Sequence, residues 1–100
     1  MKTTFREENQ NYVMTFEGRL DTPSSAQVER DMAVLYNCEG HDIILDCTAL
    51  DYITSSCLRL FLNLLKHARS NGSKVILLGL HDDIRAVLDE VGFTAIFEIR

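Results

Sequence analysis

The chain has 100 residues, a net charge of -5 and 46% hydrophobic side chains. This length suits one domain, residues 1–100, with a core that needs no metal or disulfide staples. The acidic balance has the wrong sign for binding a phosphate backbone, which argues against a nucleic-acid partner. No apolar run approaches the roughly 20 residues of a membrane helix, and residues 1–20 lack an apolar leader. We therefore expect a cytoplasmic protein with no membrane insertion.

Two short strands come first in the chain. Residues 3–8 predict an edge strand, residues 9–11 a turn, and residues 12–17 a second strand. Because successive side chains of a strand alternate between its faces, the second strand presents one apolar face. That face consists of Tyr12, Met14 and Phe16.

A helix and a central strand follow. Thr22, with Pro23 directly after it, predicts a helix N-cap and a proline in the first turn. The apolar stripe of this helix extends to Tyr36, and residues 37–40 end it. Residues 42–46 form an apolar run of strand length, which is typical of a strand inside a covered parallel sheet.

The second long helix begins near Ser55 and ends at Asn71-Gly72. Its apolar residues recur at helical spacing, which predicts firm packing on a sheet. These residues are Leu58, Leu60, Phe61, Leu62, Leu64, Leu65 and Ala68.

Residues 74–78 repeat the buried-strand pattern, and a third helix begins at Asp82 or Asp83. Gly92 ends this helix, and residues 95–99 predict a last strand. Strands joined by helices in this order predict an α/β fold. We expect a mixed, mainly parallel sheet of four or five strands, three or four helices, and an antiparallel hairpin formed by the first two strands.

Functional groups of such sheets gather where the strands end, so residues 18–24, 46–58 and 79–83 should share one rim. Three consecutive hydroxyls, Thr54, Ser55 and Ser56, reach a helix start within this rim. One of them is enough to cap the helix, and a spare hydroxyl there suits a phosphoryl group because the first-turn N–H groups favour an anion. The residues alone favour capping and leave modification open.

Other chemistry has little support in the sequence. Asp21, Asp46 and Asp51 fall near the same rim, but their spacing matches no magnesium motif, and we expect no metal and no cofactor. No nucleophile elbow or P-loop is present, so we expect no enzymatic activity.

The three cysteines, Cys38, Cys47 and Cys57, are odd in number, and their spacing fits neither paired disulfides nor a zinc hook. We expect reduced, buried thiols. For Cys57 a redox-sensitive thiol at the helix start is the alternative to burial.

Four separated blocks, in family order and spacing, resemble the STAS domain of bacterial anti-sigma factor antagonists. The resemblance covers almost the whole chain and implies its fold. The blocks are residues 18–21 (GRLD), 43–46 (IILD), 51–59 (DYITSSCLR) and 71–79 (NGSKVILLG), followed by Val87-Leu88 and Gly92-Phe93.

The resemblance implies a phosphorylation site and a partner. The family's phosphoacceptor serine precedes a glycine; here that serine is Ser56, Cys57 stands in the glycine position, and Ser55 is the fallback acceptor. The implied partner is an anti-sigma factor that is also an ATP-dependent serine kinase, and a serine phosphatase would restore binding. The implied partner-binding residues are Asp21, Thr22, Asp51, Thr54, Ser55, Cys57 and Leu58.

Two other functions remain open at this point. One is a constitutive STAS scaffold subunit of a lipid-transport or stress-sensing complex, in which the hydroxyls only cap the helix. The other is a redox-responsive domain that uses Cys57. The oligomeric state is open between a monomer and a weak homodimer.

Overall fold

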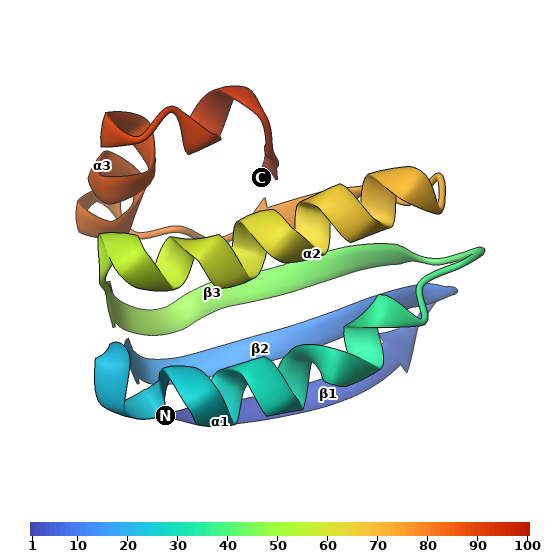
Figure 1. Ribbon diagram of the computed structural model, residues 1–100, viewed down its shortest axis with the longest axis horizontal. Coiled ribbons are helices and arrows are strands. Elements are labelled where there is room, and N and C mark those ends of the chain that lie inside the picture. Colours follow the sequence, from blue (N-terminus) through green and yellow to red (C-terminus); the bar gives the residue numbers. More distant parts are fainter.

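In the computed structural model, which describes residues 1–100, five strands form one sheet in the order β1-β2-β3-β4-β5 (Figure 1). β1 is antiparallel to β2, and every other neighbouring pair is parallel. The predicted α/β class and the antiparallel hairpin are therefore confirmed. The strands are β1 (Lys2–Glu8), β2 (Asn11–Leu20), β3 (Asp42–Ile53), β4 (Val75–Leu78) and β5 (Glu98–Ile99).

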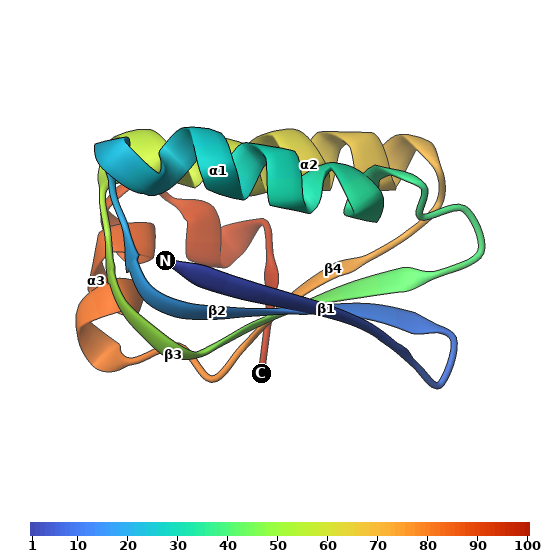
Figure 2. The same cartoon turned by 90° about the horizontal axis from the view of Figure 1, so that it is seen from below.

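Three α-helices complete the fold: α1 (Thr22–Met32), α2 (Leu58–Ser70) and α3 (Asp82–Glu90). α1 and α2 lie side by side on one face of the sheet, and α3 lies at the end of the molecule where α1 and α2 begin (Figure 2). No helix combines the length and the apolar character that a membrane crossing needs. Short 3-10 helices occupy Ala33–Tyr36, Ser55–Cys57 and Phe93–Ala95.

The core lies between the sheet and the helices α1 and α2. Alternate residues of β3 are buried, and the predicted apolar stripe of α2 packs on the sheet, with Phe61 5.5 Å from Phe16 between ring centroids. Both rings are fully buried, and burial of a side chain of this size stabilises a fold by about 1.5–3 kcal/mol. The stripe prediction is confirmed, since all its members except the half-buried Leu62 are buried.

The three thiols belong to this core. Cys38, Cys47 and Cys57 are free and buried, as expected. Burial, with a smaller contribution from the charge of Asp46, raises the pKa of the Cys47 thiol to about 12. A thiol in this environment stays protonated at neutral pH and is a poor nucleophile.

The first helix begins one residue earlier than predicted, with Asp21 as its N-cap instead of Thr22. The Asp21 carboxylate accepts the Ser24 N–H at 3.3 Å, and the Ser24 hydroxyl oxygen accepts the Asp21 N–H at 3.1 Å. This reciprocal capping box satisfies two otherwise free donors and outcompetes a threonine cap. Pro23 consequently occupies the second helical position, where its missing N–H costs nothing.

Three strand predictions are wrong in length. β2 was expected to end at residue 17 but continues to Leu20. β3 extends to Ile53 and not to residue 46, because its second half continues to pair with residues 17–20 of β2 through shifts in register that break the alternating pattern. The last strand was expected over residues 95–99, but the chain turns through a 3-10 helix first, and only Glu98–Ile99 pair with β4. The β1–β2 turn contains only Asn9 and Gln10.

Candidate functional site

Ser56 lies in the 3-10 turn that joins the end of β3 to α2. The Thr54 N–H donates to the Leu20 carbonyl at 3.2 Å, which fastens this turn to the end of β2 and the start of α1. Ser55 and Ser56 are exposed, whereas Thr54 is half-buried. The sequence-predicted hydroxyls therefore lie together at the carboxyl edge of the sheet, with two of them facing solvent.

Thr54 alone performs the capping. Its Oγ1 accepts the Cys57 N–H at 3.3 Å and lies 3.2 Å from the Ser56 Oγ. Neither serine hydroxyl accepts a backbone N–H of the turn, and the one side-chain contact there is the hydrogen bond between the Ser56 and Thr54 hydroxyls. The first-turn N–H groups of Ser55 and Ser56 have no acceptor within the helix, so they are available to donate to an added anion.

Two residues of the expected partner surface face the interior. Cys57 is 3% exposed and Leu58 is 1% exposed, and both belong to the hydrophobic core. Their apolar side chains anchor the turn from beneath, so the structure does not support their assignment as direct partner contacts. The exposed part of the surface consists of Thr22, Asp51, Ser55 and Ser56, with Asp21 and Thr54 half-buried beside it.

Asp21 is held by its neighbours as a carboxylate. The hydrogen bond from the Ser24 side chain lowers the pKa of Asp21 from its ordinary value of 3.8. Partial burial opposes this shift, and the Ser24 N–H and then the charge of Arg19 lower the pKa further. The Arg19 Nε lies 3.6 Å from the Asp21 Oδ2, and its guanidinium carbon lies 4.1 Å from the centroid of the Tyr52 ring. The same arginine thus connects the ends of β2 and β3.

A groove of about 270 Å³ separates the end of β3 from α3. Ile53, Ile84 and Val87 supply its apolar part, and Asp51 and Asp83 place two carboxylates beside them. This combination suits an apolar side chain that is flanked by a basic one. The groove and the Arg19–Tyr52 contact were missed by sequence reasoning, because they depend on how α3 packs against the extended β3.

Asp46 does not join this rim. It lies in the middle of β3, opposite Thr15 of β2, and its carboxylate accepts the backbone N–H and the hydroxyl of Thr48 at 3.0 and 2.7 Å. The expectation that residues 46–58 belong to the rim as a whole is therefore wrong for the part inside β3. No three His, Cys, Asp or Glu side chains are grouped so that they could hold a metal ion.

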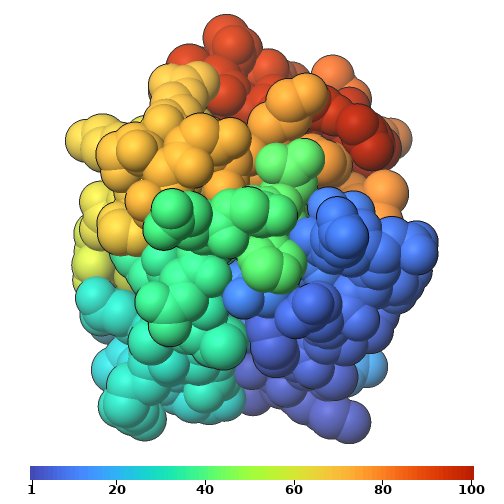
Figure 3. Space-filling model, turned by 90° about the vertical axis from the view of Figure 1, so that its right-hand side faces the viewer, coloured from blue at the N-terminus to red at the C-terminus, as the bar shows by residue number.

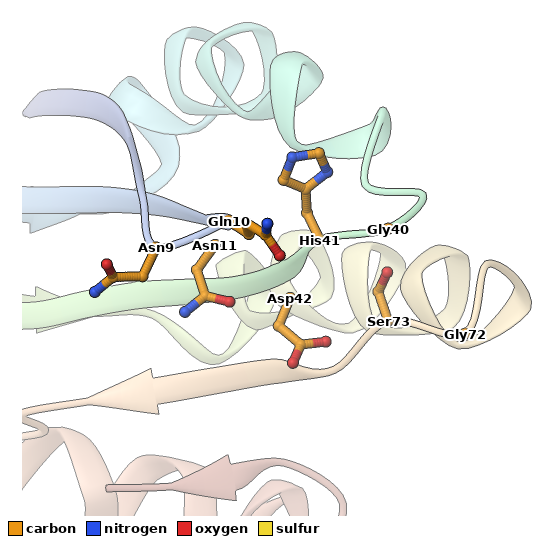
Figure 4. A pocket seen from close by; sticks show the side chains of 8 residues that line it. All are labelled: Asn9, Gln10, Asn11, Gly40, His41, Asp42, Gly72 and Ser73. Atoms are coloured by element: carbon orange, nitrogen blue, oxygen red, sulfur yellow. The ribbon is translucent and has the colours of Figure 1, made fainter.

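A polar hollow lies at the opposite end of the molecule. Segments of the chain that are distant in sequence meet there (Figure 3), and its volume is about 350 Å³. The Asp42 carboxylate accepts the Lys74 N–H at 3.0 Å, and the Ser73 hydroxyl donates to the Cys38 carbonyl at 2.8 Å, so these groups serve the loops themselves. The lining residues are Asn9, Gln10, Asn11, Gly40, His41, Asp42, Gly72 and Ser73 (Figure 4).

Comparison with known proteins assigns the fold to a family. The family model of the STAS domain matches residues 2–100. The chain is 27% identical over 99 residues to BtrV of Bordetella bronchiseptica, covering 99% of this chain and 85% of that protein. It is 28% identical over 83 residues to the anti-sigma-B factor antagonist of Listeria monocytogenes, covering 83% and 73%. The chain therefore belongs to the STAS domain family, and these two relatives are anti-sigma factor antagonists.

Solved structures agree with this fold. The anti-sigma factor antagonist SpoIIAA in its unphosphorylated form superposes with a TM-score of 0.81 at 18% identity, covering 99% of this chain and 88% of that one. The same Bacillus protein in its phosphorylated form gives a TM-score of 0.73 at 18% identity, covering 99% and 91%.

Proposed function

We propose that this protein binds an anti-sigma factor with serine kinase activity through the rim around Ser56, and that phosphorylation of Ser56 switches this binding off. The observation that carries the proposal is the exposed Ser56 hydroxyl on a turn that Thr54 already caps. The existence of SpoIIAA in phosphorylated and unphosphorylated forms supports a phosphorylation switch in a protein of this fold. The chain acts here as the substrate of a kinase, and it regulates transcription indirectly.

The proposed reaction is a phosphoryl transfer from ATP bound to the partner. The Ser56 Oγ attacks the γ-phosphorus, a new phosphorus–oxygen bond forms, and the bond to the β-phosphate oxygen breaks to release ADP. The hydroxyl proton passes to a base of the kinase. Ser55 is the alternative acceptor, since its side chain is also exposed.

The local electrostatics support an off-switch that needs no refolding. A phosphoserine adds about -1.5 to -2 charge at neutral pH, and the N–H groups at the helix start tolerate that charge within the fold. Asp21 and Asp51 already make the rim acidic, so an added phosphate repels any acidic group of the partner and must be desolvated in a close contact.

The groove next to Asp51 supports the choice of partner surface. Its apolar floor and its carboxylates, Asp51 and Asp83, favour a partner segment in which a basic side chain adjoins an apolar one. Such a segment and the kinase active site would reach the same end of the molecule, because groove and Ser56 both lie where β3 ends.

Phosphorylation is tested by incubating the protein with ATP and an anti-sigma factor kinase from the same organism, followed by peptide mass mapping. We expect one phosphate on Ser56, its loss in Ser56→Ala, and its retention in Ser55→Ala. Phosphate found only on Ser55 would make Ser55 the phosphorylation site, and a chain without phosphate would contradict the proposed switch.

Binding is tested by titrating the kinase with Ser56→Asp. We expect a roughly tenfold or larger loss of affinity, because like charges within an interface cost several kcal/mol. Asn63→Asp is the matched control, since it adds one charge on an exposed face of α2 two turns further along and should bind normally. Unchanged affinity of Ser56→Asp would favour the constitutive scaffold. A phosphatase would then have no role, because phosphorylation would not control binding.

A further inference from the structure

β1 leaves one long edge of the sheet without a partner. It is seven residues long, pairs only with β2, and all of its residues except the half-buried Thr3 are exposed. An edge of this kind presents a row of unpaired N–H and C=O groups to which another strand can pair. The outward backbone groups and the side chains of β1 determine which strand can pair with this edge.

The hairpin turn determines which amides point outward. Asn9 and Gln10, with φ of 52° and 66°, form a two-residue turn between Glu8 and Asn11, which are partners in the ladder. The residues flanking such a turn are a hydrogen-bonded pair. Because the pattern alternates along β1, the outward groups belong to the odd-numbered residues of the strand, which are Thr3, Phe5 and Glu7.

A second copy of β1 fits this edge in one favourable register. Outward groups must meet outward groups, so an antiparallel two-fold pair has its axis at Thr4, Phe5 or Arg6. An axis at Arg6 places two guanidinium groups opposite each other, and an axis at Thr4 sets Lys2 opposite Arg6. An axis at Phe5 avoids both repulsions and pairs every outward amide of the strand.

The charges complement each other in the register centred on Phe5. Lys2 then lies opposite Glu8 of the second copy, and by symmetry the same pair forms a second time. Within one chain Lys2 lies 3.8 Å from Glu17, and Glu8 lies 2.8 Å from the Arg6 Nε. The Lys2 and Glu8 side chains are nevertheless 76% and 56% exposed, so a second copy can reach them. Opposite charges would flank the axis on both sides.

Apolar side chains lie at the centre of the same edge. Phe5 is 38% exposed, lies opposite Met14 in the β1–β2 ladder, and makes an edge-to-face contact with Tyr12 at 5.3 Å between ring centroids. Phe5 of two copies would meet at the axis. A pair of aromatic rings stabilises a sheet when the rings lie opposite each other on neighbouring strands.

The adjoining helix adds a second apolar group. The Gln27 amide of α1 donates to the Met1 carbonyl at 3.1 Å, and Asp31 accepts the Thr3 hydroxyl at 2.8 Å, so α1 runs along β1 in the same direction. Val34 comes three residues after Asp31, in the 3-10 helix Ala33–Tyr36 that continues from α1, and we infer from this spacing that it lies level with Phe5. It is 40% exposed, so the edge has an apolar centre between charged ends.

We propose that the protein forms a two-fold dimer in which β1 pairs antiparallel with β1 of a second copy, with the axis at Phe5. The two sheets then become one continuous sheet. This proposal does not rest on the phosphorylation switch, because the β1 ladder ends at Glu17 and leaves Ser56 of each copy outside the paired strands.

The dimer is tested by sedimentation equilibrium of the full chain over a micromolar concentration series. We expect a monomer–dimer equilibrium whose dissociation constant rises roughly tenfold or more in Phe5→Arg, because an arginine on the axis meets its own copy. Val91→Arg, which replaces an exposed apolar residue after α3, should dimerise normally. A monomer at every concentration, or a dimer that Phe5→Arg leaves unchanged, would overturn the proposal.

The register is tested with two charge variants, Lys2→Glu and Glu8→Lys. Each variant alone should dimerise more weakly than the unmodified chain, because like charges then face each other across the axis. An equimolar mixture should form a mixed dimer, since the introduced carboxylate of one chain meets the introduced ammonium of the other. Circular dichroism checks that both variants are folded, and failure of the mixture to associate more strongly than either variant would overturn the register and the β1 pairing with it.

Discussion

The hydroxyl oxygens of Thr54 and Ser56 lie 3.2 Å apart, yet only that of Thr54 accepts a backbone N–H. Removing the Thr54 hydroxyl takes away the side-chain part of this cap, while the Cys57 N–H keeps its 3.0 Å bond to the Thr54 carbonyl. We expect Thr54→Ala to lower the free energy of unfolding by about 1 kcal/mol, as for other N-caps, with urea denaturation as the measurement. Ser56→Ala should change it by less than about 0.5 kcal/mol. Equal losses in both variants would contradict the division of roles between the two side chains.

Asp21 should make the stability of the protein sensitive to acid. Its pKa is lower in the folded chain than the ordinary value of 3.8, so the folded state favours the carboxylate. The stabilisation is complete above that ordinary value and is lost as the pH falls through the lower, folded pKa. In Asp21→Asn, the loss of stability relative to the unmodified chain should be present at neutral pH and should shrink below pH 3.8.

Urea denaturation at several pH values measures this difference. Asp89→Asn is the control, since Asp89 is exposed and its carboxylate makes no hydrogen bond or ion pair. A difference between Asp21→Asn and the unmodified chain that stays constant through the acidic range would argue against a lowered pKa of Asp21.

Position 79 must be a glycine, because its backbone lies too close to Thr48 to leave room for a side chain. A Cβ at Gly79 would overlap the Thr48 hydroxyl and lie 3.3 Å from the Thr48 Cα, and the φ of Gly79 is +73°. Gly72 has the same φ of +73° but open space around it. Gly72→Ala therefore reports the backbone cost alone, about 1 kcal/mol, and Gly79→Ala should cost clearly more in thermal or urea unfolding. Equal losses of stability in Gly72→Ala and Gly79→Ala would show that Thr48 of β3 and the β4–α3 connection can move apart to make room for the new methyl group.

The thiols should resist alkylation while the chain is folded. All three are buried, and burial with the nearby Asp46 charge raises the pKa of the Cys47 thiol to about 12. We expect negligible iodoacetamide labelling at neutral pH under native conditions and complete labelling in denaturant, read by intact mass. Rapid native labelling confined to Cys57 would revive the redox-responsive alternative.

Much of the fold was predictable from local patterns. The stripe of α2 and the alternation of Tyr12, Met14 and Phe16 report on burial directly, because helical and strand periods differ. The long β3 was not predictable, since its register shifts interrupt the alternation just where the rim begins. The cap at Asp21 was missed because Thr22 before Pro23 is itself a strong capping pattern, and only the geometry shows which oxygen the Ser24 N–H reaches.

The functional surface was predictable only in part. The hydroxyl run identified the turn between β3 and α2, and the thiol and stripe patterns correctly predicted burial of Cys57 and Leu58. The family resemblance nevertheless implied both as partner-binding residues, although they fill the core. The groove beside Asp51 depends on α3, whose placement comes from tertiary packing.

The shortness of β5 limits how copies of this chain assemble. Only Ile76 and Leu77 of β4 find partners in β5, so the far side of the sheet offers too few amides to template another strand. Addition of strands would therefore stop after β1 has met β1, because the chain has a single usable edge. A dimer of this geometry would be closed, with no long strand edge left to which a third copy could add.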